Sequence, residues 1–167
     1  MTFNEQNQYP FPADTVIQVF ADKDYFLEKY RLSGASNIQL LEDTRDADHS
    51  RIVTQRDVDI DINVPAFARK FVPDVVTLIQ TDAWDRRRKT GQLDIRFKGV
   101  PAEVHCDMTL TGHDHQSTLD LNFSVRVGVP MIGDKLASVL ARDLKTKFQR
   151  DARHAEQVMG QIAERYR

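Results

Sequence analysis

The stretch DVDIDINVPAFARKFVPDVVTLIQTDAW, residues 57–84, changes its hydrophobic period twice. Apolar residues alternate with aspartates over residues 57–62, which is typical of a strand with one buried face. A short apolar segment bracketed by Pro65 and Pro73 follows at helical spacing, and strand-like residues then resume. The stretch therefore predicts two strands joined by a short apolar cover, with the row of aspartates on the solvated side.

Similar alternation extends outward from this stretch in both directions. Residues 93–98, 104–110 and 119–127 repeat it after the stretch, and a further segment begins before it at Ile38. Residues 3–9 form one more short alternating segment near the start. Repeated period-two segments separated by turn residues predict an antiparallel sheet with one buried face.

Helical spacing replaces the alternation near both ends of the chain. Apolar residues over 13–30 recur every three or four positions, which predicts two short helices, with Asp22 able to cap the second and Gly34 placed to stop it. The same spacing over 131–166 predicts one long helix, on the order of 50 Å at 1.5 Å per residue. Such a helix would have to lie along the concave side of a twisted sheet.

Composition indicates a single domain over residues 1–167. The 23 basic and 25 acidic residues nearly cancel, so no global field favours nucleic acid or an anionic membrane as a partner. Cys106 is the only cysteine, which excludes an internal disulfide. Without an apolar span or a secretory pattern at the start, we expect a soluble, cytoplasmic protein. No feature of the sequence calls for a cofactor, and the oligomeric state stays open.

Three stretches carry a resemblance to a known superfamily: YPFPADTVIQVFAD (9–22), VPAFARKFVPDVVTLIQTDAW (64–84) and VRVGVPMIGDKLASVL (125–140). With the order of elements, they resemble the START-like helix-grip superfamily, also called SRPBCC, and within it a bacterial domain family of unknown function. The resemblance implies an α+β fold: a strongly curved antiparallel sheet of about seven strands, two short helices after the first strand, and a long C-terminal helix across the concave face.

The same resemblance implies a hydrophobic cavity between the sheet and the last helix. Superfamily members bind lipids, sterols, polyketides or other apolar molecules, and some catalyse cyclisation or hydrolysis. We expect inward positions to line the cavity, namely Trp84, Phe97, Met108, Leu110, Phe123, Met131, Leu136 and Leu140. Phe67 and Phe71 would then form a lid at the cavity mouth, or simply plug the end of the core.

Histidines and aspartates around one predicted turn could suit a zinc-like ion: His105, His113, His115, Asp107 and Asp114. Against this, residues in or beside a turn are ordinarily polar, and the parity of His105 is opposite to that of the apolar positions around it. The predicted site residues therefore include no metal ligand.

Two further features have an ordinary structural interpretation. Cys106 shares parity with inward residues, so a small buried hydrophobe is the favoured reading over a nucleophile. The basic run over residues 86–89 could contact an anionic group, but a solvated turn is the favoured reading.

Alternation cannot decide which side of residues 75–84 faces inward, because both sides are partly apolar. If Trp84 faces inward, then Gln80 and Asp82 do so as well. Asp82, Glu103 and Asp120 remain ambiguous as acids or bases, and no catalytic residue is assigned.

We therefore expect a protein that binds a small hydrophobic or amphipathic molecule, lipid-like, polyketide-like or isoprenoid-like, in that cavity. An enzyme of the polyketide cyclase or hydrolase kind is one alternative, and a buried titratable group would favour it. A filled-core module for protein interaction is the other alternative, and the absence of a cavity would favour it.

Overall fold

The computed structural model describes residues 1–60 and 66–167, apart from the side chain of His113. The elements over these residues are β1 (Thr2–Tyr9), α1 (Ala13–Phe20), α2 (Lys23–Leu32), β2 (Ser36–Arg45), β3 (His49–Asp59), η1 (Ala66–Phe71), β4 (Val75–Asp85), β5 (Thr90–Phe97), β6 (Ala102–His113), β7 (Gln116–Val127), α3 (Gly133–Ala163) and η2 (Glu164–Tyr166). Their order is the predicted one. Asp61, which the sequence placed on a solvated strand face, lies outside the described residues.

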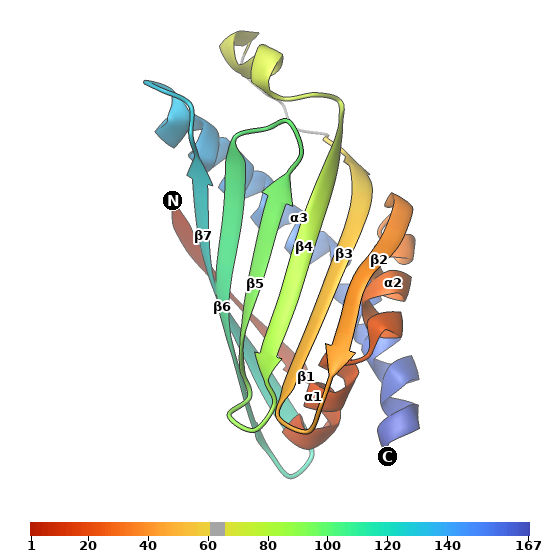
Figure 1. Ribbon diagram of the computed structural model, residues 1–167. Coiled ribbons are helices and arrows are strands. Elements are labelled where there is room, and N and C mark those ends of the chain that lie inside the picture. Colours follow the sequence, from red (N-terminus) through yellow and green to blue (C-terminus); the bar gives the residue numbers. More distant parts are fainter. Residues whose placement is uncertain (61–65) are drawn as a thin grey trace.

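The described strands form one seven-stranded antiparallel sheet in the order β1-β7-β6-β5-β4-β3-β2. Consecutive strands from β2 to β7 are neighbours. β1 pairs with β7, so that β1 and β2 are the two edge strands of the sheet. The sheet is curved, and α3 runs diagonally across one face of it (Figure 1). The predicted α+β helix-grip fold is therefore confirmed.

Local signals explain where α2 begins and ends. Asp22 is its N-cap, because the Asp22 carboxylate accepts a hydrogen bond of 2.9 Å from the backbone N–H of Asp24. Gly34 follows the helix with a φ of 86°, a left-handed conformation that glycine adopts without a steric penalty. Both predicted boundaries of this helix are confirmed.

The edge strand β2 departs from the simple alternation that the sequence suggested. Ile38 packs against the core, but Leu40 is exposed. The pairing of β2 with β3 shifts in register between Leu40 and Glu42, and such a bulge turns the following side chains away from the regular pattern.

Helix α3 is buried at its two ends and not between them. Leu136, Ala137 and Ala141 are buried near the start, and Val158 and Ile162 are among the buried residues near the end. None of the residues 142–157 is fully buried. The helix is therefore anchored at both ends, and its middle is less completely covered by the neighbouring elements. None of the helices in the described part of the chain is long and apolar enough to cross a membrane.

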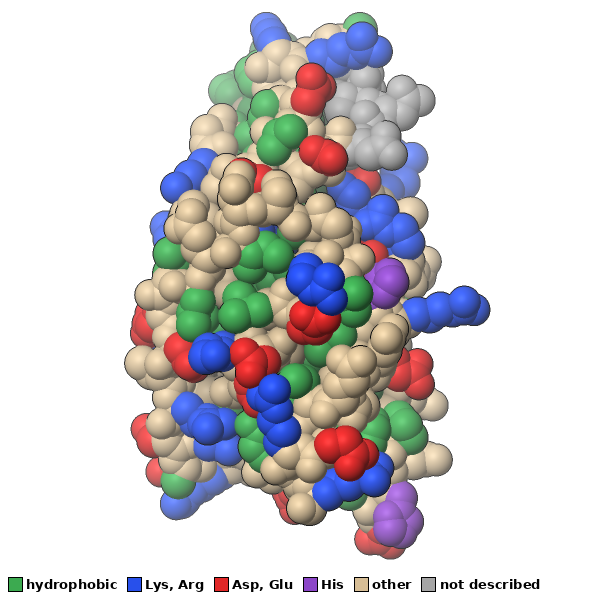
Figure 2. Space-filling model, turned by 90° about the vertical axis from the view of Figure 1, so that its right-hand side faces the viewer, with side chains coloured by type: hydrophobic (Ala, Val, Ile, Leu, Met, Phe, Trp, Pro, Cys, Tyr) green, Lys and Arg blue, Asp and Glu red, His purple; other side chains and the backbone are tan. Residues whose placement is uncertain are grey.

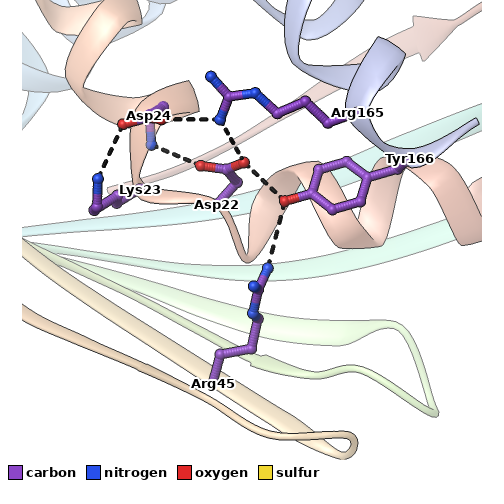
Figure 3. A network of polar contacts seen from close by, with 6 residues as sticks. All are labelled: Asp22, Lys23, Asp24, Arg45, Arg165 and Tyr166. Carbon is purple, nitrogen blue, oxygen red and sulfur yellow. Dashed lines mark hydrogen bonds and ion pairs between the residues drawn. The ribbon is translucent and has the colours of Figure 1, made fainter.

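A group of polar residues, here called the C-terminal clasp, ties η2 to the start of α2 (Figure 3). One nitrogen of Arg165 lies 3.0 Å from a carboxylate oxygen of Asp22 and 2.8 Å from one of Asp24. The hydroxyl of Tyr166 donates to Asp22 at 2.7 Å and accepts from Arg45 at 3.4 Å. The Asp22 carboxylate therefore joins the start of α2 to the C-terminus, and Tyr166 links this group to β2.

Replacing Asp22 with alanine is expected to lower the free energy of unfolding by about 2 kcal/mol, because the change removes a helix cap and the centre of the clasp together. Asp22→Asn keeps a capping oxygen and should cost about half as much. Urea denaturation measures both. Glu28→Ala, which removes an exposed pair with Arg31, is the control and should cost less than about 0.5 kcal/mol. An equal cost for Asp22→Ala and Glu28→Ala would contradict the structural role of the clasp.

Candidate functional site

A cavity of about 790 Å³ lies between the inner face of the sheet and helices α2 and α3. Its walls are mainly apolar and aromatic, and all the strands except β2 contribute to them. The cavity reaches the surface, because its lining includes the exposed residues Asp59, Asp74 and Arg150. Figure 2 shows the side of the molecule that lies to the right in Figure 1, where hydrophobic side chains gather in the middle of a face between charges of both signs.

Five of the residues expected from the sequence lie on the cavity wall: Trp84, Phe97, Met108, Phe123 and Leu140. Phe123 also stacks on Phe3 of β1, with ring centroids 4.6 Å apart. Strand alternation brings the strand residues among them to the concave face, and Leu140 faces the cavity from α3. Whether they contact a ligand stays a prediction.

Three other expected lining residues lie away from the wall. Leu110 is buried towards the end of β6 that α1 covers, where Ala13 approaches Gly112. Leu136 is buried in the first turns of α3, in the anchored part of the helix. Met131 is fully exposed, because it precedes α3 and has a φ of 71° instead of continuing the helical stripe.

The expected lid segment forms the short helix η1 beyond the end of the sheet (Figure 1). Phe67 is exposed and Phe71 is half-buried, and neither belongs to the cavity lining. The buried residue of this helix is Ala68. A lid role for the segment therefore stays a prediction, and Phe67 does not plug the core.

The structure resolves the facing of β4 that alternation left open. The buried residues are Val76, Leu78, Gln80, Asp82 and Trp84, whereas the residues between them are half-buried. Gln80 and Asp82 therefore point into the cavity together with Trp84. Asp82 is the functional candidate that the sequence left ambiguous.

Five side chains form a polar group in the cavity, here called the cavity polar cluster: Lys29, Tyr30, Arg56, Gln80 and Asp82. Arg56 donates a hydrogen bond of 3.0 Å to the amide oxygen of Gln80, and the Gln80 amide nitrogen donates one of 3.0 Å to Asp82. The Arg56 guanidinium also lies 3.7 Å from the centre of the Tyr30 ring, a cation–π distance. Three elements, α2, β3 and β4, thus bring the cluster together.

Burial shifts the acid–base properties of this cluster. It raises the pKa of Asp82 to about 6, although the charges of Lys29 and Arg56 and a hydrogen bond from Gln80 act in the opposite direction. Burial lowers the pKa of Lys29 to about 8, opposed by the charge of Asp82. At pH 7 both groups therefore remain mainly ionised, and the pKa of each lies within about one or two units of neutral pH.

Lys29 is also surrounded by aromatic rings. Its ammonium group lies 4.8 Å from the centre of the Tyr25 ring and 5.1 Å from that of Phe26. These distances permit cation–π attraction, which partly replaces the lost hydration of the ammonium group.

Some polar atoms of the cluster form no hydrogen bond of normal geometry with a described residue. They are the buried Tyr30 hydroxyl and one terminal nitrogen of Arg56, Nη1. The Tyr30 hydroxyl lies near Arg56 and near the Thr54 hydroxyl, which is likewise buried without such a bond. Buried polar groups are nearly always satisfied, so unpartnered donors beside a cavity indicate room for a bound polar group.

The histidines and aspartates that were weighed as metal ligands lie elsewhere. The His105 ring lies on the sheet face opposite the cavity, 2.7 Å from Asp94 and 3.1 Å from Asp107, and the Asp94 hydrogen bond raises the pKa of His105. His115 is exposed, and the side chain of His113 lies outside the described residues. In the part of the chain that the structure describes, no three His, Cys, Asp or Glu side chains are placed to hold a metal ion.

Cys106 and the basic run over residues 86–89 both contribute to the structure of the domain. Cys106 is fully buried, and burial raises the pKa of its thiol to about 12, so the thiolate is not available near neutral pH. In the run over 86–89, Arg87 pairs with Asp48 and Lys89 lies 3.0 Å from Asp14. These ion pairs join neighbouring hairpins and α1.

Comparison with known proteins places this geometry in context. A family model described as "Protein of unknown function (DUF2505)" matches residues 4–158. None of the curated proteins matches the chain in sequence.

Solved structures match over nearly the whole chain. The Zhui aromatase/cyclase from Streptomyces sp. R1128 has a TM-score of 0.57 at 16% identity, covering 100% of this chain and 96% of its own. Norcoclaurine synthase from Thalictrum flavum has a TM-score of 0.60 at 10% identity, with 98% and 87% covered. A START superfamily protein from Mycobacterium smegmatis has a TM-score of 0.55 at 11% identity, with 96% and 98% covered. At such identities the likeness shows the START-like fold alone.

Proposed function

The chain belongs to the DUF2505 family of proteins of unknown function, and from this premise we propose that it binds a small hydrophobic or amphipathic molecule. The binding site is the cavity between the sheet and α3, and residues 1–167 act as one ligand-binding domain. The observation that carries the proposal is the cavity of about 790 Å³ with mainly apolar walls. Small-molecule sites typically have volumes of about 300–1,000 Å³ and walls of this kind.

Apolar burial would supply most of the binding free energy. A ligand that buries about 300 Å² of apolar surface gains about 7 kcal/mol, from which the cost of association is subtracted. The solved structures with this fold include proteins described as an aromatase/cyclase and as norcoclaurine synthase. That likeness supports a small-molecule ligand for this chain, without specifying one.

Native mass spectrometry of the protein purified from cells, followed by identification of any compound released on denaturation, tests the proposal. We expect an apolar or amphipathic compound in stoichiometric amount. A protein that never retains or takes up such compounds would contradict the proposal.

A variant that fills the cavity gives a second test. Ala155 of α3 lines the cavity, so Ala155→Phe is expected to weaken ligand binding at least tenfold while leaving the sheet intact. Thr146→Phe adds the same ring at an exposed position of α3 outside the cavity lining and should leave affinity unchanged within twofold. Isothermal titration measures both. Equal affinities for the two variants would place the ligand elsewhere.

A second candidate function is catalysis of a proton-transfer step in the same cavity. The observation that favours it is the buried carboxyl of Asp82, whose pKa of about 6 suits a general acid or base near neutral pH. A catalyst would convert the compound that it binds into a product of different structure, which can be an isomer of the same mass, whereas a carrier would release the compound unchanged. Chromatography and NMR of the compound before and after incubation with the protein distinguish the two.

A further inference from the structure

The cavity polar cluster holds unequal numbers of positive and negative groups. Arg56 and Lys29 are cationic at pH 7, and Asp82 is the one carboxylate in the cluster. Gln80 separates the Arg56 guanidinium from Asp82, since it accepts from the first and donates to the second. Among the described residues, neither cation forms an ion pair, so the cavity polar cluster itself carries one positive charge in excess.

The other carboxylates of the cavity lining stand outside the cluster, although the charge of Asp151 acts on Lys29. Asp143 pairs with Lys147 of the same helix at 2.9 Å, and Asp151 lies 3.1 Å from Arg150. Asp59 and Asp74 are exposed to solvent, which screens their charge. None of these carboxylates neutralises the cations of the cavity polar cluster at hydrogen-bond distance.

The donors of the cluster point to the kind of group that would complete it. The Tyr30 side chain is almost fully buried and lines the cavity, and its hydroxyl, which lies near Thr54 and Arg56, forms no hydrogen bond of normal geometry with a described residue. The neighbouring Arg56 keeps one terminal nitrogen unpaired as well. A buried guanidinium nitrogen without an acceptor is costly, and a carboxylate is the partner that matches the paired N–H geometry of a guanidinium.

Resting on the proposed function, we propose that the ligand carries a carboxylate, which Arg56 and Tyr30 bind while its apolar body lies along the aromatic wall. The carboxylate accepts from the free nitrogen of Arg56 and from the Tyr30 hydroxyl, and Lys29 adds a second positive charge nearby. The apolar body extends toward Leu121, Phe123 and Leu144, which belong to the lining away from the cluster. A monocarboxylate with a long apolar chain or a fused ring system is therefore the ligand class.

A pair of probes with the same chain and different head groups tests the inference. Dodecanoate and dodecan-1-ol are titrated at pH 7, below their aggregation concentrations, with calorimetry and with the fluorescence of Trp84, the only tryptophan and part of the lining, as readouts. We expect dodecanoate to bind at least tenfold more tightly. Arg56→Met should weaken dodecanoate binding at least tenfold and leave dodecan-1-ol within twofold, because the apolar contacts remain.

Two further variants keep the test decisive. Tyr30→Phe removes only the free hydroxyl and should weaken dodecanoate three- to tenfold, which decides the matter if Arg56→Met does not fold by circular dichroism. Arg96→Met removes a positive charge from an exposed position of β5 and should change neither probe.

The outcomes distinguish failure of the carboxylate inference from failure of the proposed function. Equal binding of both probes by the unaltered protein overturns the carboxylate inference and leaves the proposed function standing. Binding of neither probe contradicts both. An undiminished preference for dodecanoate in Arg56→Met and Tyr30→Phe alike overturns the role of these two residues.

Discussion

Replacing Gly91 with alanine is expected to lower the free energy of unfolding by about 3 kcal/mol, because the added methyl group has no space. A Cβ atom at this position would lie 2.6 Å from Cδ2 of Trp84 and 2.8 Å from the carbonyl oxygen of Ala83. The carbonyl oxygen belongs to β4, which is paired with β5 at this point. The Trp84 ring stacks on Phe20 with centroids 5.3 Å apart, so it can withdraw only by losing that contact.

Urea denaturation followed by circular dichroism measures this effect, and Gly160→Ala is the matched control. Gly160 lies in α3, and the nearest atom to an added Cβ is Cζ of Phe11 at 3.9 Å, an ordinary contact. Alanine favours a helix interior over glycine, so this control should raise stability by about 0.5–1 kcal/mol. If Gly91→Ala costs less than about 0.5 kcal/mol, the Trp84 ring is not held as rigidly as its surroundings indicate.

Asp82→Asn is expected to change the pH dependence of stability by about 3 kcal/mol between pH 4 and pH 7. Folding raises the pKa of Asp82 from 3.8 to about 6, so the folded protein favours the neutral carboxyl. The stability linked to this proton is fully present below about pH 4 and is lost as the pH rises through 6. Asparagine cannot ionise, and its side-chain oxygen can still accept the Gln80 hydrogen bond, so the variant gains stability relative to the unaltered protein over this range.

The free energy of unfolding of both proteins is measured in urea at pH 4, 5, 6 and 7. Higher pH is avoided because the pKa of Lys29 is lowered to about 8 and its deprotonation adds an opposite slope. Asp114→Asn, at an exposed turn, is the control for loss of a carboxylate and should change the free energy of unfolding at pH 7 by less than about 0.5 kcal/mol. Parallel profiles for Asp82→Asn and the unaltered protein would mean that Asp82 titrates normally and is not desolvated.

The element order was predictable because the hydrophobic period changes sharply along the chain. The change from period two to helical spacing after residue 130 marks α3, and the Asp22 cap and Gly34 stop mark α2. The exposure of Leu40 was not predictable from the sequence. A register shift between paired strands depends on the partner strand and leaves no local signal in the sequence.

The cavity polar cluster was only partly visible in the sequence. Asp82 stayed ambiguous because both sides of β4 carry apolar residues. The structure explains this pattern, since the outer side of the strand is itself half-buried. Arg56 carried a usable signal that the sequence analysis missed: it shares parity with Val58, which places a charge on the predicted inner face of β3. The cavity itself depends on side-chain volumes and packing, which no pattern encodes.

The uneven anchoring of α3 has a mechanical consequence. Local stability follows the density of buried apolar contacts, so the two ends of the helix hold firmly and the stretch over residues 142–157 is the compliant part of the cavity wall. A helix that is fixed at both ends can bend outward in the middle while its ends stay in place. Under the proposed function, we therefore expect the α3 side of the cavity to adjust to ligands of different width while the seven-stranded sheet keeps its shape.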